Sequence, residues 1–261
     1  TASITIAVNS IPTITSSIPG TRCDAGTVNL SASASAGVVN WYSSQTGGTS
    51  FYTGTSYSPN INSTTSFYVE ATNNNCTSNR TQIIATVNQS PILSSVTSQS
   101  ICAGDNSSAI SFSSNVAGST FSWSNTNTLI GLSGNGNGNI APFVTINNSS
   151  TNANAAITAS ATANGCTSNS TTFNITIKPK PSITTNLEQT ICSEQQFTFT
   201  PQNNTNGIVP ANTTLTWTVS NSNVTGEQSN PSSGVGTLNQ TLTNTAYTNN
   251  QVVYTITPVA N

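Results

Sequence analysis

Short runs of alternating apolar and polar residues recur along the chain, and clusters of Asn, Ser, Gly or Pro separate them. The stretch 161–181 reads ATANGCTSNSTTFNITIKPKP, and it alternates Phe173, Ile175 and Ile177 with polar residues after an Asn-Gly-Cys turn. A period of two with one apolar face predicts a half-buried strand, and the Asn-Gly turn before it predicts a hairpin. The pattern therefore predicts an all-β chain.

The same stretch occurs earlier in the chain, as ATNNNCTSNRTQIIATVNQSP at 71–91. Its second half alone opens the chain as TASITIAVNSIP, and its first half alone closes the chain as ITPVAN. A unit that recurs at a fixed period indicates a tandem array. The predicted parts are a closing strand of a preceding repeat at 1–9, repeat one at 10–90, repeat two at 91–180, and repeat three at 181–261 without its closing strand.

The alternating runs also predict individual strands. Repeat one is expected to hold strands at 27–34, 38–42, 50–52, 65–72 and 80–88. Repeat two is expected to hold strands at 109–113, 120–124, 128–132, 143–146, 155–163 and 172–178. Repeat three is expected to hold strands at 197–200, 215–220, 238–243 and 252–257. The glycine-rich residues 134–139 lack the βαβ context and the following Lys of a nucleotide site, so they predict a flexible hairpin loop.

Five cysteines follow the repeat: Cys23, Cys76, Cys102, Cys166 and Cys192. Their spacing favours disulfides Cys23–Cys76 and Cys102–Cys166, which leaves Cys192 unpaired in this segment. Aligning ATANGC with the final VAN predicts that the natural chain continues past Asn261 with a small residue and then a cysteine. Disulfides indicate an extracellular location. The alternatives are buried free thiols and, more weakly, zinc, because His and C-x-x-C pairs are absent.

Each repeat also places a tryptophan 18, 21 or 25 residues after its first cysteine. The order Cys, Trp, Cys is that of immunoglobulin-like sandwiches. We therefore expect Trp41, Trp123 and Trp217 to fill the cores, with ligand stacking at the surface as the alternative. Cys76 lies in a predicted hairpin turn, so its bond is expected to tie loops at one end of a sandwich.

Composition excludes several classes of function. Charged residues make up 4% of the chain and the net charge is -2, so no basic patch is available for nucleic acid. No run of 18 apolar residues is present that could span a membrane. Without His there is no base for a serine nucleophile, and the six acids offer no convincing glycosidase pair. We predict no catalytic residues, no cofactor and no metal.

Two minor alternatives concern ligands. Asp24, Asp105 and Glu194 each lie within three residues of the first cysteine of a repeat. They are expected to be solvated or to cap turns, and a weak calcium site is the alternative. The aromatic residues Tyr42, Tyr52 and Tyr57 are candidates for direct contacts with glycans.

Six stretches of the sequence support a resemblance to known modules. Repeat one, with RCDAGTVNLSASASAGVVNWY, TGGTSFYTGTSYSP and TTSFYVEATNNNCTS, resembles the immunoglobulin-like modules of giant Bacteroidota surface proteins. Repeat three, with TICSEQQFTFTP, NGIVPANTTLTWTVS and QVVYTITP, resembles the PKD-like modules of the same proteins, and repeat two is a looser relative. The resemblance implies a cell-surface adhesin of the SprB type, exported by type IX secretion. Its implied partners are a substratum or polysaccharide and the gliding or secretion machinery.

The sequence therefore predicts tandem immunoglobulin-like and PKD-like β-sandwich domains joined by short Pro linkers. Their expected function is that of a stalk in a repetitive adhesin, with a role in gliding motility implied by the resemblance. Two alternatives stay open. The repeats bind glycans themselves, or the spare strand at 1–9 is donated to another subunit in an extracellular filament.

Overall fold

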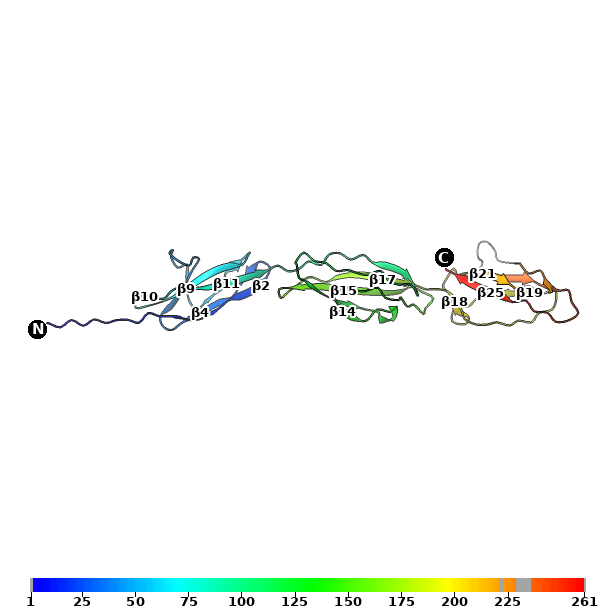
Figure 1. Cartoon of the computed structure of the whole chain (residues 1–261), viewed down its shortest axis with the longest axis horizontal. Coiled ribbons are helices and arrows are strands. Elements are labelled where there is room, and N and C mark those ends of the chain that lie inside the picture. Colours follow the sequence, from blue (N-terminus) through cyan, green and yellow to red (C-terminus); the bar gives the residue numbers. More distant parts are fainter. Residues whose placement is uncertain (1, 221–222, 229–235, 261) are drawn as a thin grey trace. The chain divides into compact units, whose positions relative to one another are not determined.

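The computed structural model describes residues 2–220, 223–228 and 236–260. Within these ranges the regular elements are β-strands and one short 3-10 helix, which confirms the predicted all-β class (Figure 1). The chain divides into two compact units. Unit 1 comprises residues 1–94, 113–121 and 160–170, and unit 2 comprises residues 95–112, 122–159 and 171–261. Thr1 and Asn261, the ends of the outermost predicted ranges, lie outside the described residues.

Unit 1 contains a β-sandwich built from two sheets. The first sheet has the order β1-β4-β7, with strands Ile14–Ile18, Leu30–Ala34 and Ser56–Tyr57. The second has the order β2-β11-β9-β5-β6, with strands Gly20–Cys23, Thr81–Asn88, Thr65–Asn73, Val38–Tyr42 and Tyr52–Thr53. Two short pairings complete it: β10 (Cys76–Thr77) pairs with the end of β9, and β3 (Gly26–Thr27) pairs with β8 (Asn60–Ile61).

The core of this sandwich follows from the period of two. Every second residue of β9 points inward, so Phe67 and Val69 are buried, as is Ile83 on β11. They pack with residues of the facing sheet such as Leu30. Trp41 is fully buried among them, and its Nε1 donates a hydrogen bond to the carbonyl oxygen of Gly54 at 2.8 Å. Burying each such side chain contributes about 1.5–3 kcal/mol, so these positions dominate the stability of the sandwich.

The first strand changes sheets at Gly20. β1 belongs to one sheet and β2 to the other, with only Pro19 between them. A Cβ at Gly20 would lie 2.3 Å from Cγ1 of Val28 and 2.5 Å from the carbonyl oxygen of Asn29. No residue with a Cβ fits at position 20 without displacing its neighbours. β1 and β2 are not among the strands predicted for repeat one, which begin at residue 27.

Residues 2–9 were predicted to be a closing strand, and they form no strand in this structure. Their alternating apolar side chains are exposed: Ile4 by 87%, Ile6 by 75% and Val8 by 90%. Residues 2–9 thus have the apolar alternation of a strand but pair with no sheet in this structure.

Unit 2 contains most of a third large sheet, which has the strand order β12-β17-β15-β13-β14. Its strands are Gln99–Cys102, Thr171–Lys178, Ala153–Ala163, Thr120–Asn125 and Asn135–Asn137. β16 (Cys166–Thr167), which belongs to unit 1, pairs with the end of β15. The predicted alternation again sets the buried face, since Ile157 on β15 and Phe173, Ile175 and Ile177 on β17 are buried.

Two predictions for this region were wrong. Residues 128–132, expected as a strand, contain the 3-10 helix η1 (Thr128–Ile130) because Asn127 caps its start and Gly131 ends it at φ 96°. Residues 134–139, expected as a flexible loop, contain β14, which pairs with β13. The reason is Gly136, where a Cβ would lie 2.3 Å from Cζ2 of Trp123, so glycine lets the strand lie against the indole.

Two further predicted strands of repeat two contain only one isolated β-bridge each. Residues 109–113 contain only the bridge between Ile110 and Ile140, and residues 143–146 only the bridge between Asn106 and Val144. Ile110 and Phe112 are buried, so apolar alternation marked the core positions of residues 109–113, although they form no ladder. In residues 143–146 it did not, since Val144 and Ile146 are exposed by 58% and 44%.

The last part of unit 2 consists of paired short strands. Its described residues form four antiparallel pairs: β18 (Ser182–Ile183) with β20 (Gly207–Ile208), β19 (Gln196–Phe199) with β23 (Leu238–Thr241), β21 (Thr214–Val219) with β25 (Tyr254–Val259), and β22 (Val224–Thr225) with β24 (Thr243–Asn244). Leu215, Trp217 and Leu238 form the buried centre of this region.

The neighbouring residues Ile83 and Ile84 of β11 test the assignment of the core. Ile83 is 2% exposed and Ile84 is 41% exposed. We expect Ile83→Ala to lower the free energy of unfolding of the first sandwich by about 2–5 kcal/mol, because it leaves a cavity. The matched control Ile84→Ala should change it by less than about 1 kcal/mol. Hydrogen exchange of peptides from β9 and β11 measures both, and equal losses would contradict the assigned faces.

Candidate functional site

The most distinctive chemical feature is a disulfide between Cys23 and Cys166, 143 residues apart in sequence. The predicted pairings Cys23–Cys76 and Cys102–Cys166 do not form in this structure, and Cys76, Cys102 and Cys192 are free thiols. The bond therefore joins the first strand of predicted repeat one to the hairpin of predicted repeat two. In the chain-entropy model a loop of this length stabilises the folded state by about 5 kcal/mol.

Strand pairing explains why Cys23 does not reach Cys76. β2 runs parallel to β11, and Cys23 pairs with Asn88, the last residue of β11. Cys76 pairs with Asn73 in the hairpin that precedes β11. The eight residues of β11 span about 25 Å, whereas a disulfide needs Cα atoms within about 7 Å. The two cysteines of repeat one thus lie at opposite ends of its sheet.

The second pairing fails for the same reason. Cys102 pairs with Lys178 at the end of β17. Cys166 pairs with Ala163 in the hairpin that precedes β17. Spacing groups the cysteines by repeat, but the parallel first strand carries the first cysteine of repeats one and two to the far end of the closing strand.

Hydrogen bonds position the chain around the disulfide. The side-chain amide of Asn88 donates to the carbonyl oxygen of Asn164 at 2.8 Å, and Sγ of Cys166 lies 3.9 Å from the carbonyl oxygen of Asn88. The amide of Asp24 donates to that same carbonyl at 2.8 Å. On the other side, the carboxylate of Asp24 accepts from the amide of Ser90 at 2.9 Å. Asn88 therefore contacts both cysteines of the disulfide: it pairs with Cys23 in the ladder, and its carbonyl oxygen lies beside Sγ of Cys166.

The pKa of Asp24 is lowered, chiefly by the hydrogen bond from the amide of Ser90. A lowered folded pKa means that this contact stabilises the fold above the ordinary pKa of Asp and is lost as the pH falls through the folded value. Asp24 thus fixes the segment that follows β11 through one hydrogen bond to the backbone. Among the described residues, no group of three potential metal ligands is found.

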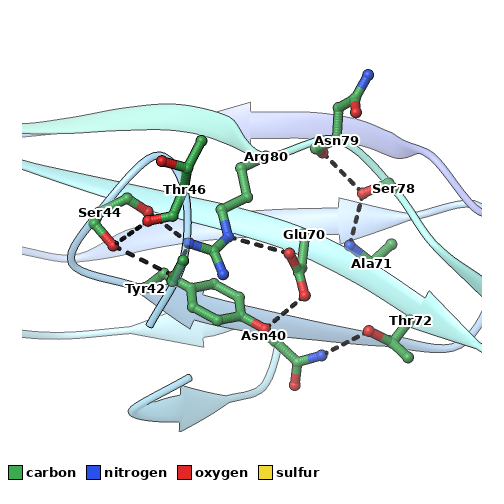
Figure 2. Close-up of polar contacts among 11 residues, drawn as sticks. Asn40, Tyr42, Ser44, Thr46, Glu70, Ala71, Thr72, Ser78, Asn79 and Arg80 are labelled. Carbon is green, nitrogen blue, oxygen red and sulfur yellow. Dashed lines mark hydrogen bonds and ion pairs between the residues drawn. The ribbon is translucent and has the colours of Figure 1, made fainter. Parts of the chain in front are cut away.

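A second polar cluster surrounds Arg80 and is shown in Figure 2. The guanidinium Nε of Arg80 donates to Oε2 of Glu70 at 3.1 Å, and both side chains are almost buried, with exposed fractions of 11% and 14%. Its Nη1 donates to the carbonyl oxygens of Ser44 and Gly47, at 2.8 and 2.7 Å. Arg80 thus ties the turn after β5 to β9 and to the start of β11.

Tyr42 completes this cluster. Its hydroxyl donates to Oε1 of Glu70 at 2.5 Å, and the guanidinium carbon of Arg80 lies 3.3 Å from the centre of its ring. Burial and the hydrogen bond to Glu70 raise the pKa of the Tyr42 hydroxyl. Tyr42 is 8% exposed, so it stabilises the fold and does not present a glycan-binding surface, contrary to its candidate role. Glu70 lies on β9 and Arg80 directly before β11, and two opposite charges so placed in so uncharged a chain are the sequence signal for this cluster.

The other two candidate tyrosines lie in an aromatic group. The rings of Tyr52 and Tyr57 are 5.2 Å apart, and Phe51 is also 5.2 Å from Tyr57. Tyr57 in turn contacts Trp41 and Phe67 of the core. Phe51 and Tyr52 are exposed by 46% and 41%, so one side of the group faces solvent while the other side packs on the sandwich.

The three tryptophans are buried, with 0%, 8% and 6% exposure for Trp41, Trp123 and Trp217. Nε1 of Trp217 donates to the carbonyl oxygen of Gln228 at 3.0 Å. Nε1 of Trp123 has no hydrogen-bond partner within the described part of the chain. A surface-stacking role does not fit these positions. Across the described residues, none of the helical segments has the length and apolar character to cross a membrane.

Comparisons with known proteins agree with this architecture. Residues 10–88 match the family model described as "Ig-like domain CHU_C associated", and residues 189–261 match the model described as "PKD-like domain". The chain is therefore a tandem array of immunoglobulin-like and PKD-like β-sandwich domains. Such domains are generally non-catalytic structural modules.

Several solved structures match the chain at low identity. Dpr2 Ig1-Ig2 in complex with DIP-Theta Ig1-Ig3 matches at 10% identity and TM-score 0.38, over 96% of this chain and 98% of that one. Immunoglobulin domains 1–4 of Sidekick-1 match at 13% identity and TM-score 0.37, over 64% of this chain and 48% of that one. The mouse coronavirus receptor-binding domain complexed with its murine receptor matches at 15% identity and TM-score 0.37, over 61% of this chain and 96% of that one. TM-scores this low carry no argument about function, and no curated protein matches the chain.

Trypsin offers a direct test of the disulfide. The chain has four basic residues, and both lysines precede proline, where trypsin cuts poorly, so the main fragments are residues 1–22, 23–80 and 81–261. We expect the denatured, alkylated and unreduced protein to keep fragments 23–80 and 81–261 linked, with reduction releasing them. Bonds confined to each repeat would separate the two fragments without reduction, and Cys23→Ser should do the same.

The ion pair between Arg80 and Glu70 can be tested by a double-mutant cycle. Removing one partner leaves the other almost buried without its counter-charge, so Glu70→Gln or Arg80→Gln should each cost about 2–4 kcal/mol in unfolding free energy. The double variant should cost less than the sum of the two, because neither charge is then left alone. Denaturant titration measures all four proteins. Strictly additive losses would show that the pair is not coupled.

Proposed function

We propose that this chain is a segment of a repetitive extracellular adhesin and acts there as a stalk. The proposed modules are residues 10–90, 91–180 and 181–261, with residues 1–9 as the closing strand of a preceding module. The observation that carries the proposal is the Cys23–Cys166 bond, which links two successive repeats covalently. A bond of this kind serves a chain that must stay connected outside the cell, where disulfides persist.

Other features of the chain support a spacer. The described polar clusters are occupied by their own chain: Glu70 binds Arg80 and Tyr42, and Asp24 binds the amide of Ser90. Short proline-containing linkers restrict bending between modules. The low charge limits ionic adhesion to unrelated surfaces. These properties favour a segment that carries a binding tip away from the cell.

The family models support a more specific proposal. Modules of the two matched kinds are typical of Bacteroidota surface proteins. The parent protein is proposed to be a giant adhesin of the SprB type, exported by type IX secretion, that attaches to a substratum or polysaccharide and is moved by the gliding machinery. Its localisation is the cell surface.

A second candidate function is direct glycan binding by the aromatic group. Phe51 and Tyr52 expose part of their rings, and an aromatic face can stack on a sugar ring. The surface is small, and Tyr57 beneath it is held by core contacts. The exposed rings of Phe51 and Tyr52 are therefore the observation that favours glycan binding, and no other candidate tyrosine contributes.

Bead detachment separates the two functions. Beads coated with the full chain are pulled from glass and from polysaccharide films, with uncoated beads as the reference. A stalk segment is expected to give detachment forces no higher than the reference. Strong, saturable adhesion would overturn the stalk proposal for this segment. If Tyr52→Ala then abolished adhesion and the fully exposed Tyr247→Ala did not, the aromatic group would be the binding site.

A further inference from the structure

The free cysteine Cys76 occupies the same structural position in repeat one as Cys166 does in repeat two. Each lies just after a two-residue turn with left-handed backbone, at φ 47° and 63° for Asn74 and Asn75, and at 52° and 78° for Asn164 and Gly165. Cys76 pairs with Asn73 across its turn, as Cys166 does with Ala163. The two hairpins therefore present their sulfur atoms in the same way.

The surroundings of the two sulfur atoms also correspond. Sγ of Cys166 lies 3.9 Å from the carbonyl oxygen of Asn88, whose side chain donates to Asn164 at 2.8 Å. Sγ of Cys76 lies 3.8 Å from the carbonyl oxygen of Asn9, whose side chain donates to the carbonyl oxygen of Asn74 at 3.4 Å. Asn9 aligns with Asn88 in the repeat. The hairpin of Cys76 thus binds the end of residues 1–9 as the hairpin of Cys166 binds the end of β11.

Cys102, in unit 2, repeats the position of Cys23. It pairs with Lys178 in the parallel ladder of β12 and β17, and the next amide, that of Ala103, donates to the carbonyl oxygen of Lys178 at 2.9 Å. Cys23 pairs with Asn88, and the next amide, that of Asp24, donates to the carbonyl oxygen of Asn88 at 2.8 Å. Cys102 is an exposed free thiol.

We propose that the disulfides of the array are staggered, so that each hairpin cysteine bonds the first-strand cysteine of the module before it. Cys23–Cys166 is one such bond. Cys76 bonds the first-strand cysteine of a module closed by residues 1–9, and Cys102 bonds the hairpin cysteine of the module that holds Cys192. The inference rests on the proposed tandem array, but it does not depend on adhesion.

Each bond forms by exchange with a small-molecule disulfide such as oxidised glutathione. The first cysteine thiolate attacks the glutathione disulfide and releases one glutathione thiolate. The second cysteine thiolate attacks the mixed disulfide and releases the other. Two protein thiols are oxidised to one disulfide, and one glutathione disulfide takes up the two electrons and becomes two glutathione molecules.

A duplicated chain tests this inference. A copy of residues 10–79 is placed before Thr1 of the full chain, so that residues 1–9 close the copied module. The protein is oxidised with oxidised glutathione, denatured, alkylated and cut with trypsin without reduction. We expect most molecules to hold three large fragments together, because the copied Cys23 bonds Cys76 while Cys23 bonds Cys166. The copied Cys76 should remain an alkylated free thiol.

The competing pattern is recognisable in the same digest. A bond between the copied Cys23 and the copied Cys76 lies within one tryptic fragment, which would then separate from the rest without reduction and overturn the inference. Replacing Cys76 with Ser in the duplicated chain is the matched control, and it should release the copied fragment. A failure of the bead assay would leave these outcomes unchanged, so the inference and the proposed function are tested separately.

The other end of the chain provides a second, independent variant. Residues 165–178 are appended after Asn261, which supplies a hairpin cysteine and a closing strand. Peptide mapping of the oxidised protein should join the appended cysteine to Cys102 and leave Cys192 free. A bond from the appended cysteine to Cys192, or a free appended cysteine beside a free Cys102, would overturn the staggered pattern even if the duplicated chain failed to fold.

Discussion

The parallel pairing of the first strand with the closing strand determines where the cysteines lie. β2 crosses from one sheet to the other at Gly20 and then runs beside β11 in the same direction. Cys23 is therefore carried to the end of β11, where the chain leaves the sandwich. The hairpin before β11 holds Cys76 at the opposite end. A bond within one repeat would have to span the whole strand, whereas Cys166 lies directly beside Asn88 and Cys23.

The rest of the first sandwich depends on ordinary apolar burial, with one polar exception. Alternating residues of β9 and β11 form the core around Trp41. Arg80 and Glu70 are almost buried in a chain with very few charges, and their hydrogen bonds fix the turn after β5. Burying a charged pair adds little stability compared with apolar packing, so its main contribution is the conformation of that turn.

The sequence predicted the all-β class, most of the long strands and the buried tryptophans, because all of these depend on local alternation. It failed where geometry depends on distant segments. Residues 128–132 have strand-like composition, yet the Asn127 cap and Gly131 produce a 3-10 helix. Residues 134–139 resemble a loop, yet the indole of Trp123 makes glycine the residue that a strand needs there. The pairing of the cysteines could not be read from spacing, because spacing does not reveal that the first strand is parallel to the last.

The staggered pattern has a mechanical consequence that bonds confined to each module lack. If every disulfide stayed within one module, no disulfide would span the linker between the second cysteine of one module and the first cysteine of the next. A single cut in that linker would then separate the chain into two pieces. Cys23–Cys166 instead spans the linker at Pro91 and encloses both Cys76 and Cys102. If Cys102 is bonded in the same way to the following module, its loop begins before Cys166 and overlaps the first one. Successive loops then interlock, so every peptide bond within the array is bridged by at least one disulfide. A single proteolytic cut in an array bonded in this way leaves its two halves covalently joined.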